Sequence, residues 1–119
     1  MSTYVDGFVL PLPKDKIEDY RKMAAIASEV WREHGALDYR ECVLEDPTAK
    51  DCVSFPQLAN TKEGETVVFA YITYKSRADR DAIMPKVMAD PRLAGCGQET
   101  MPFDCSRMCY GGFETIVGD

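Results

Sequence analysis

The sequence predicts a single α+β domain whose elements follow the order strand, helix, strand, strand, helix, strand. Two segments, residues 14–34 and 76–90, have apolar residues at the spacing of three and four that is typical of amphipathic helices. Four other segments read as strands, with short apolar runs bounded by Pro, Gly or polar residues. The chain has 119 residues, enough for one hydrophobic core, so we expect residues 1–119 to form one domain.

The first strand and the first helix have the clearest patterns. Residues 4–11 (YVDGFVLP) form an apolar run of strand length that ends at Pro11. The helix of residues 14–34 has a buried stripe that consists of Ile17, Tyr20, Ala24, Ala27, Trp31 and His34. Gly35 supplies the usual helix stop.

The second strand and the connection after it are less regular. Residues 37–44 (LDYRECVL) suit a strand in which one face holds Leu37, Tyr39, Glu41 and Val43. Residues 45–65 form a long polar connection, which is uncommon in a compact domain unless it has a role. Within it, residues 53–56 (VSFP) predict a short edge strand.

Residues 66–74 (TVVFAYITY) predict a strand that is apolar on both faces. Because side chains alternate along a strand, one face would hold Val67, Phe69 and Tyr71. The other face would hold Val68, Ala70, Ile72 and Tyr74. The predicted helices cover only one face of the sheet, so the other face needs a second cover. Leaving three residues such as Val68, Ile72 and Tyr74 exposed would forgo about 5 kcal/mol, comparable to the stability of a small domain. We therefore expect a homodimer that forms through the sheet face.

The second helix begins at Ser76, which forms a capping-box pattern with Asp79. Its short stripe consists of Ile83, Met84, Val87 and Met88. Pro85 lacks an N–H, so we expect it to bend or interrupt this helix.

Residues 107–117 (RMCYGGFETIV) predict the last strand. This order is the split βαβ arrangement of ferredoxin-like domains, with a four-stranded antiparallel sheet and both helices on one face.

Four long sequence blocks resemble those of a known family. They are WREHGALDYREC (31–42), YKSRADRD (74–81), KVMADPR (86–92) and MPFDCSRMCYGGFE (101–114). On these blocks the chain resembles the YbaA-like family of uncharacterised bacterial proteins. The resemblance implies a place in the dimeric α/β-barrel superfamily, in which two ferredoxin-like subunits pack their sheets face to face. It implies no activity.

Charge and composition exclude several kinds of partner. The net charge is −6, whereas a nucleic-acid interface needs a basic stripe that neutralises phosphates, so we expect no nucleic-acid partner. The sequence has no run of about 18 apolar residues and no secretory signal pattern. We expect no membrane association and a cytoplasmic location.

The cysteines do not predict a metal or disulfide site. Five are present, an odd number without a CxxC pair: Cys42, Cys52, Cys96, Cys105 and Cys109. We expect reduced thiols that are buried incidentally. The spacing of Cys105 and Cys109 with the lone His34 matches no common zinc site, so no metal or cofactor is expected.

His34 and Glu41 are the candidate catalytic residues. His34 lies in the last turn of the first helix, where the helix dipole favours its protonated form, and Glu41 on the next strand is its candidate partner for general acid–base chemistry. The alternative role for His34 is to cap the terminal carbonyls or to fill the seam between helix and sheet.

Aromatic residues are the candidate ligand-binding residues. A cavity for a flat small molecule could be lined by Trp31, Tyr39, Phe69, Tyr71 and Tyr110. Ordinary core packing explains the same residues equally well. Asp6, a carboxylate in an apolar strand, should need an ion pair, for which Arg40 and Arg107 are the candidates.

Two classes of function are compatible with these residues. The first, which the sequence favours because it shows no nucleophile, metal set or cofactor loop, is a dimeric small-molecule-binding or interaction module without catalysis. The alternative is a cofactor-independent enzyme of the monooxygenase or isomerase type, acting on a small aromatic or apolar substrate. A cavity between the first helix and the sheet that holds His34 and a carboxylate would favour the enzyme, whereas a filled core would favour the module.

Overall fold

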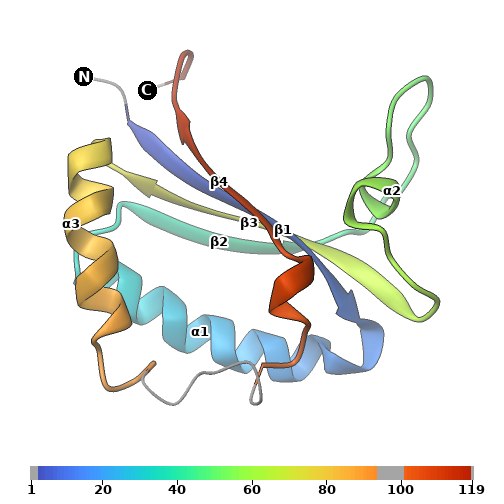
Figure 1. Ribbon diagram of the computed structural model, residues 1–119, viewed down its shortest axis with the longest axis horizontal. Coiled ribbons are helices and arrows are strands. Elements are labelled where there is room, and N and C mark those ends of the chain that lie inside the picture. The colour runs from blue at the N-terminus through green and yellow to red at the C-terminus, as the bar shows by residue number, and fades with distance from the viewer. Residues whose placement is uncertain (1–2, 94–100, 119) are drawn as a thin grey trace.

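A four-stranded antiparallel sheet forms the centre of the molecule, with two long helices on one face (Figure 1). The computed structural model describes residues 3–93 and 101–118. Its strands are β1 (Tyr4–Pro13), β2 (Asp38–Val43), β3 (Glu65–Tyr74) and β4 (Cys109–Glu114), in the order β2-β3-β1-β4. The helices are α1 (Ile17–Glu33), which follows the 3-10 turn η1 (Lys14–Lys16), and α3 (Arg77–Met88). The predicted ferredoxin-like arrangement is confirmed.

The core lies between the helices and the sheet and has two parts. One part, under the C-terminal half of α1 and under α3, consists of Val30, Trp31, Ala36, Ile72, Tyr74, Ile83 and Val87. The other, under the N-terminal half of α1, consists of Leu10, Leu12, Tyr20, Ala24, Val68 and Phe103. The predicted stripe of α1 therefore packs in the core as expected, except for His34, which caps the helix.

The face of β3 that points away from the two long helices, α1 and α3, is the opposite of the one predicted. Val68, Ile72 and Tyr74 are at most 2% exposed, because they lie under the helices. The open face instead has Phe69 and, from β4, Phe113, which are 43% and 60% exposed. Alternation separates two sets of residues on a strand, but only tertiary packing determines which set meets the helices. The prediction that both faces are apolar remains correct.

The connection between β2 and β3 contains a helix where a strand was predicted. Within this arm (residues 44–64), α2 (Phe55–Ala59) begins after Ser54, whose side chain accepts a hydrogen bond from the Gln57 backbone N–H at 3.3 Å. The Gln57 side chain accepts in return from the Ser54 backbone N–H, so the pair is a capping box that favours a helix over an edge strand. The arm extends from the sheet on the side away from α1 (Figure 1).

The ends of the remaining elements follow local signals in the sequence. Gly35 adopts a φ of 119° just past α1, a conformation that glycine reaches without strain. Ser76 caps α3 by accepting a hydrogen bond from the Asp79 backbone N–H, as predicted, and α3 continues through Pro85 to Met88 without interruption. The last strand is shorter than predicted at both ends, because its expected start lies in a 3-10 turn, η3 (Cys105–Arg107), and β4 ends at Glu114. None of the helices described is both long and apolar enough to cross a membrane.

Candidate functional site

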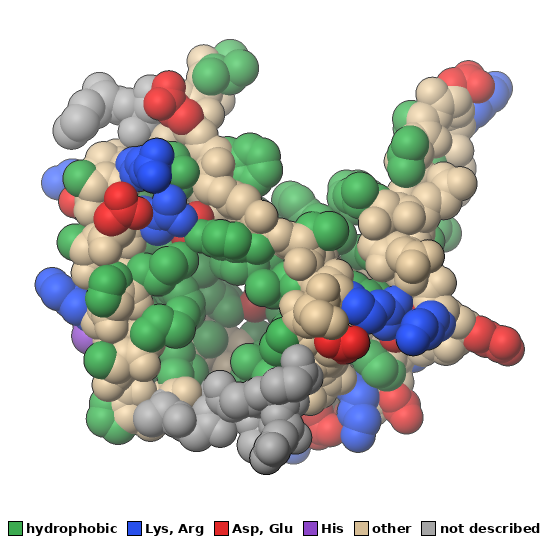
Figure 2. Space-filling view, in the orientation of Figure 1, with side chains coloured by type: hydrophobic (Ala, Val, Ile, Leu, Met, Phe, Trp, Pro, Cys, Tyr) green, Lys and Arg blue, Asp and Glu red, His purple; other side chains and the backbone are tan. Residues whose placement is uncertain are grey.

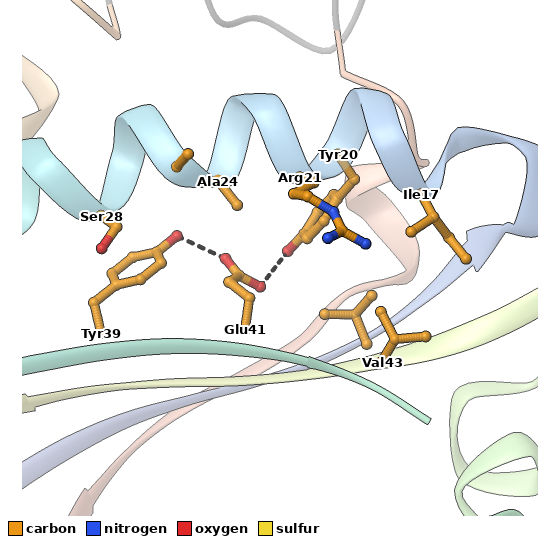
Figure 3. A pocket seen from close by; sticks show the side chains of 10 residues that line it. Ile17, Tyr20, Arg21, Ala24, Ser28, Tyr39, Glu41 and Val43 are labelled. Carbon is orange, nitrogen blue, oxygen red and sulfur yellow. Dashed lines mark hydrogen bonds between the residues drawn. The ribbon is translucent and has the colours of Figure 1, made fainter. Parts of the chain in front are cut away.

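A carboxylate held by two phenols is the most distinctive polar arrangement on the helix-covered face (Figure 3). The Tyr20 hydroxyl donates to Glu41 Oε1 at 2.6 Å, and the Tyr39 hydroxyl donates to Glu41 Oε2, also at 2.6 Å. Oxygen–oxygen distances this short are typical of hydroxyl donors bonded to an ionised carboxylate. We call these three residues the Glu41 cluster.

Two elements place the Glu41 cluster. Tyr39 and Glu41 are two residues apart on the edge strand β2, so their side chains point to the same face, toward α1. Tyr20 is the fourth residue of α1 and is only 6% exposed. A buried phenol requires a hydrogen-bond partner, and the strand supplies it.

The electrostatics of the Glu41 cluster follow from its partial burial. Burial raises the pKa of Glu41, although the hydrogen bonds from Tyr20 and Tyr39 act in the opposite direction. Burial, together with the nearby Glu41 charge, raises the pKa of both tyrosines well above the usual range. The two phenols therefore stay protonated and act as donors.

Two cavities meet at the Glu41 cluster, since Tyr20, Tyr39 and Glu41 line both of them. The larger one, about 480 Å³, opens between α1 and β2 and is also lined by Arg21 and Ser28. The other, about 260 Å³, is mostly apolar, and its walls include Phe8, Met23, Trp31, Ile72, Met88 and Met108. Figure 2 shows hydrophobic side chains lining a hollow between α3 and η3. The volumes of the two cavities approach or fall within the range of sites for small organic ligands.

The structure does not bring the five predicted aromatic residues together. Trp31 and Tyr39 line the apolar cavity, with ring centroids 6.1 Å apart. Tyr110 is on the same face of the sheet, but its hydroxyl bonds to Asp6. Phe69 and Tyr71 point to the open face, because they alternate with the residues under the helices.

The structure also separates His34 from Glu41. His34 caps α1, and its Nε2 lies 3.0 Å from Asp90 Oδ2, just beyond the end of α3. Hydrogen bonds from Arg92, and then from His34, hold the pKa of Asp90 well below its usual range. Within residues 3–93 and 101–118, no hydrogen bond joins His34 to Glu41, and His34 does not line either cavity.

Asp6 has the predicted ion pair, but with a different arginine from the two expected. Asp6 is fully buried, and its Oδ1 lies 3.1 Å from Arg80 Nη1. The hydroxyls of Tyr74 and Tyr110 each donate to the same carboxylate at 3.0 Å. The predicted partners, Arg40 and Arg107, pair with Asp38 and Glu65 instead.

The cysteines differ from the expectation of incidental burial. Cys42, Cys52 and Cys109 are exposed, because Cys42 and Cys109 point to the open face and Cys52 is on the arm. Cys96 lies outside the described residues. In the part of the chain that the structure describes, no three His, Cys, Asp or Glu side chains are grouped as metal ligands.

Two important residues were not recognised from the sequence as parts of a site. The sequence places Tyr20 on the helix stripe, and a phenol on a buried stripe already signals a hidden hydrogen-bond partner. Arg80 is in the first turns of α3, and nothing in its local sequence indicates that it reaches Asp6 on β1.

The comparisons with known proteins identify the family. Residues 3–105 match the family described as "Protein of unknown function (DUF1428)". The chain belongs to this family. It is 46% identical over 116 residues to "Uncharacterized protein YbaA" of Escherichia coli K12, with 98% of each chain covered. The protein of the same description from Shigella flexneri is equally similar. The family's description assigns no activity, in agreement with the resemblance noted from the sequence.

A solved structure supports the fold of this family member independently. A dimeric ferredoxin-like protein from an uncultured marine organism superposes with a TM-score of 0.64, with both chains covered completely. Their sequences are only 10% identical, so this likeness concerns the fold alone. The superposition agrees with the order of helices and strands and with the sheet topology described above.

Proposed function

We propose that this protein binds a small organic molecule in the cavities beside Glu41. The observation that supports this most directly is the Glu41 cluster itself, a partly buried carboxylate at the junction of a polar and an apolar cavity. Charged side chains are rarely buried unless they are paired or functional, and ligand sites typically combine apolar walls with a few polar groups. Trp31 and Tyr39 retain the ligand-binding role expected from the sequence.

A second candidate function is proton transfer on such a molecule. Burial raises the pKa of Glu41, which brings the carboxyl closer to the range in which a general base can take and return a proton. An isomerase-type reaction needs only this exchange and no cofactor. In this version Glu41, rather than His34, is the catalytic residue, because Glu41 lines both cavities and His34 lines neither.

We also propose that the protein forms a homodimer through its open sheet face. Phe69 and Phe113 are large, exposed and on the same face, and Phe69 continues through an aromatic contact of 6.2 Å to Phe55 on the arm. Contiguous exposed apolar groups mark interaction sites. The marine ferredoxin-like protein is described as dimeric, which supports the same arrangement here. The net charge of −6 supports a partner other than nucleic acid, and we expect a cytoplasmic location.

Trp31 provides a direct test of ligand binding. It is the only tryptophan of the chain and lines the apolar cavity, so its fluorescence should report occupancy. Titration with 2-phenylethanol should change the fluorescence of the wild type in a saturable manner. Ala27→Leu should fill part of the cavity and weaken this binding, whereas Ala82→Leu, at an exposed position of α3, should not. Native mass spectrometry of the freshly purified protein should reveal any retained ligand.

A result that contradicts the proposal is equally clear. If 2-phenylethanol and other single-ring probes leave the Trp31 spectrum unchanged up to millimolar concentration, and the purified protein has no added mass, the cavity is not a ligand site. Equal binding by Ala27→Leu and the wild type would place the bound molecule elsewhere.

A further inference from the structure

We propose that the ligand of the Glu41 cavity is an organic ammonium ion with a small apolar body. Its ammonium group would bind the Glu41 carboxylate, and its body would occupy the apolar cavity beside Trp31. This inference rests on the proposed binding function and specifies its ligand class.

The Glu41 cluster offers hydrogen-bond acceptors and no donors. Each tyrosine hydroxyl has one proton, and both protons already point to Glu41 at 2.6 Å. The oxygens of Tyr20 and Tyr39 therefore present only lone pairs to the cavity, as the ionised carboxylate of Glu41 does. A ligand that is complementary to four such oxygens must donate, and an ammonium group has three donors and no acceptor.

The charge of Glu41 has no cation nearby. No Lys, Arg or His nitrogen within residues 3–93 and 101–118 lies within 4.0 Å of its carboxylate, and residues 94–100 contain none of these side chains. Arg21, on the wall of the larger cavity, pairs with Glu18 at 3.3 Å and is largely exposed. Burying a negative charge without a cation beside it costs free energy, so a cationic ligand would reduce this cost.

Other partly buried or buried carboxylates of this protein show how unusual Glu41 is. Asp6 is paired with Arg80, Glu65 with Arg107, and Asp90 with both His34 and Arg92. Each of these contacts is 3.1 Å or shorter. Unlike these three carboxylates, Glu41 has no such partner within residues 3–93 and 101–118, and it lines both cavities.

The walls of the apolar cavity suit the rest of such a ligand. Trp31 and Tyr39 present aromatic surfaces beside Glu41, and ring faces attract cations as well as apolar groups. The volume of about 260 Å³ is sufficient for a single ring with a short side chain. An apolar monoamine therefore fits both the shape and the charge of the site.

Three matched probes test this inference, namely 2-phenylethylamine, 2-phenylethanol and 3-phenylpropionate. They share the same ring and differ in being cationic, neutral and anionic at pH 7.5. Titrations followed by Trp31 fluorescence and by calorimetry should show that the wild type binds the amine at least tenfold more tightly than the alcohol, with the acid weakest. Glu41→Gln should abolish the preference for the amine and still bind the alcohol.

The outcomes separate this inference from the proposed function. Glu29→Gln, on the exposed side of α1, should keep the preference for the amine, which excludes a general effect of the net charge. If the wild type binds the alcohol or the acid as tightly as the amine, the ammonium assignment is wrong but the cavity remains a ligand site. If no probe binds, both proposals are overturned.

Discussion

Asp6 and Arg80, 74 residues apart, form an ion pair of 3.1 Å that joins the central strand β1 to α3. Asp6 is fully buried, and the Arg80 side chain is only 13% exposed. Arg80 also donates to the hydroxyls of Tyr110 and Tyr4, and its guanidinium lies 5.0 Å from the Tyr4 ring centroid. The pair is thus the centre of a polar network within the helix-covered face, where an isolated charge would be strongly unfavourable.

Replacing Arg80 should therefore destabilise the protein strongly. Arg80→Met leaves the Asp6 carboxylate buried without a cation, and we expect a loss of about 3–5 kcal/mol in the free energy of unfolding measured with urea. Arg77→Met, on the same helix but 70% exposed, is the matched control and should change stability by less than about 0.5 kcal/mol. Similar losses for both variants would show that the ion pair has no special role.

The raised pKa of Glu41 predicts that this residue makes the free energy of unfolding depend on pH. Because burial raises this pKa above its ordinary value of 4.5, the folded state binds the proton more tightly than the unfolded state. This group therefore reduces stability as pH rises from about 4.5 through the folded pKa, and has no further effect above it. Glu41→Gln lacks this effect, so its free energy of unfolding relative to wild type should increase between pH 4 and pH 8.

Urea titrations at several pH values would measure this difference. Glu114→Gln, an exposed position on β4, provides the control for removing one negative charge. A stability difference between Glu41→Gln and wild type that is constant with pH, or that decreases as pH rises, would contradict the assignment.

Glu65 should show the opposite pH dependence. Two hydrogen bonds from Arg107, at 2.8 and 2.9 Å, lower the pKa of Glu65 to about 2. The stabilising effect is complete above pH 4.5 and decreases as pH falls toward 2. Arg107→Gln should thus be less stable than wild type at pH 7, and the difference should shrink by pH 3.

Unfolding curves of wild type and Arg107→Gln at pH 7, 5 and 3 would measure this trend. Arg40→Gln removes an exposed arginine and controls for the loss of one positive charge. A difference that grows as the solution becomes acidic would contradict the proposed role of the pair.

Much of the fold could be predicted because its signals are local. The period of α1 and the cap at Ser76 depend on neighbouring residues, and the structure has both. The helix α2 was missed although its capping box, Ser54 with Gln57, was visible in the sequence. The prediction for the open face of β3 is wrong, because alternation does not determine which face meets the helices.

The site was less predictable because its contacts are distant in sequence. Glu41 was recognised, but its partner Tyr20 is 21 residues away on another element. His34 and Asp90 are 56 residues apart, so no local pattern indicated that they would bond. Residue type predicts which side chains need partners, whereas the topology decides which partners they meet.

The open sheet face makes a prediction about assembly. Phe69 is in the middle of this face and contacts both Phe55 and Tyr71, at centroid distances of 6.2 Å. A charge at its position would be buried between two sheets, so Phe69→Asp should dissociate the homodimer at micromolar concentration. Leu37→Asp is the control, since Leu37 is 56% exposed but precedes β2 rather than pointing from the open face.

Analytical ultracentrifugation would measure this change, with circular dichroism to verify that each variant is folded. Wild type and Leu37→Asp should sediment with the mass of two chains, and Phe69→Asp with the mass of one. Phe113→Asp, on β4, gives a second test of the same face, because Phe113 is 60% exposed. If the wild type is monomeric, or if both phenylalanine variants remain dimeric, the second copy does not cover this face. The exposed phenylalanines would then have to meet a different partner, since apolar groups of this size are seldom left in water without one.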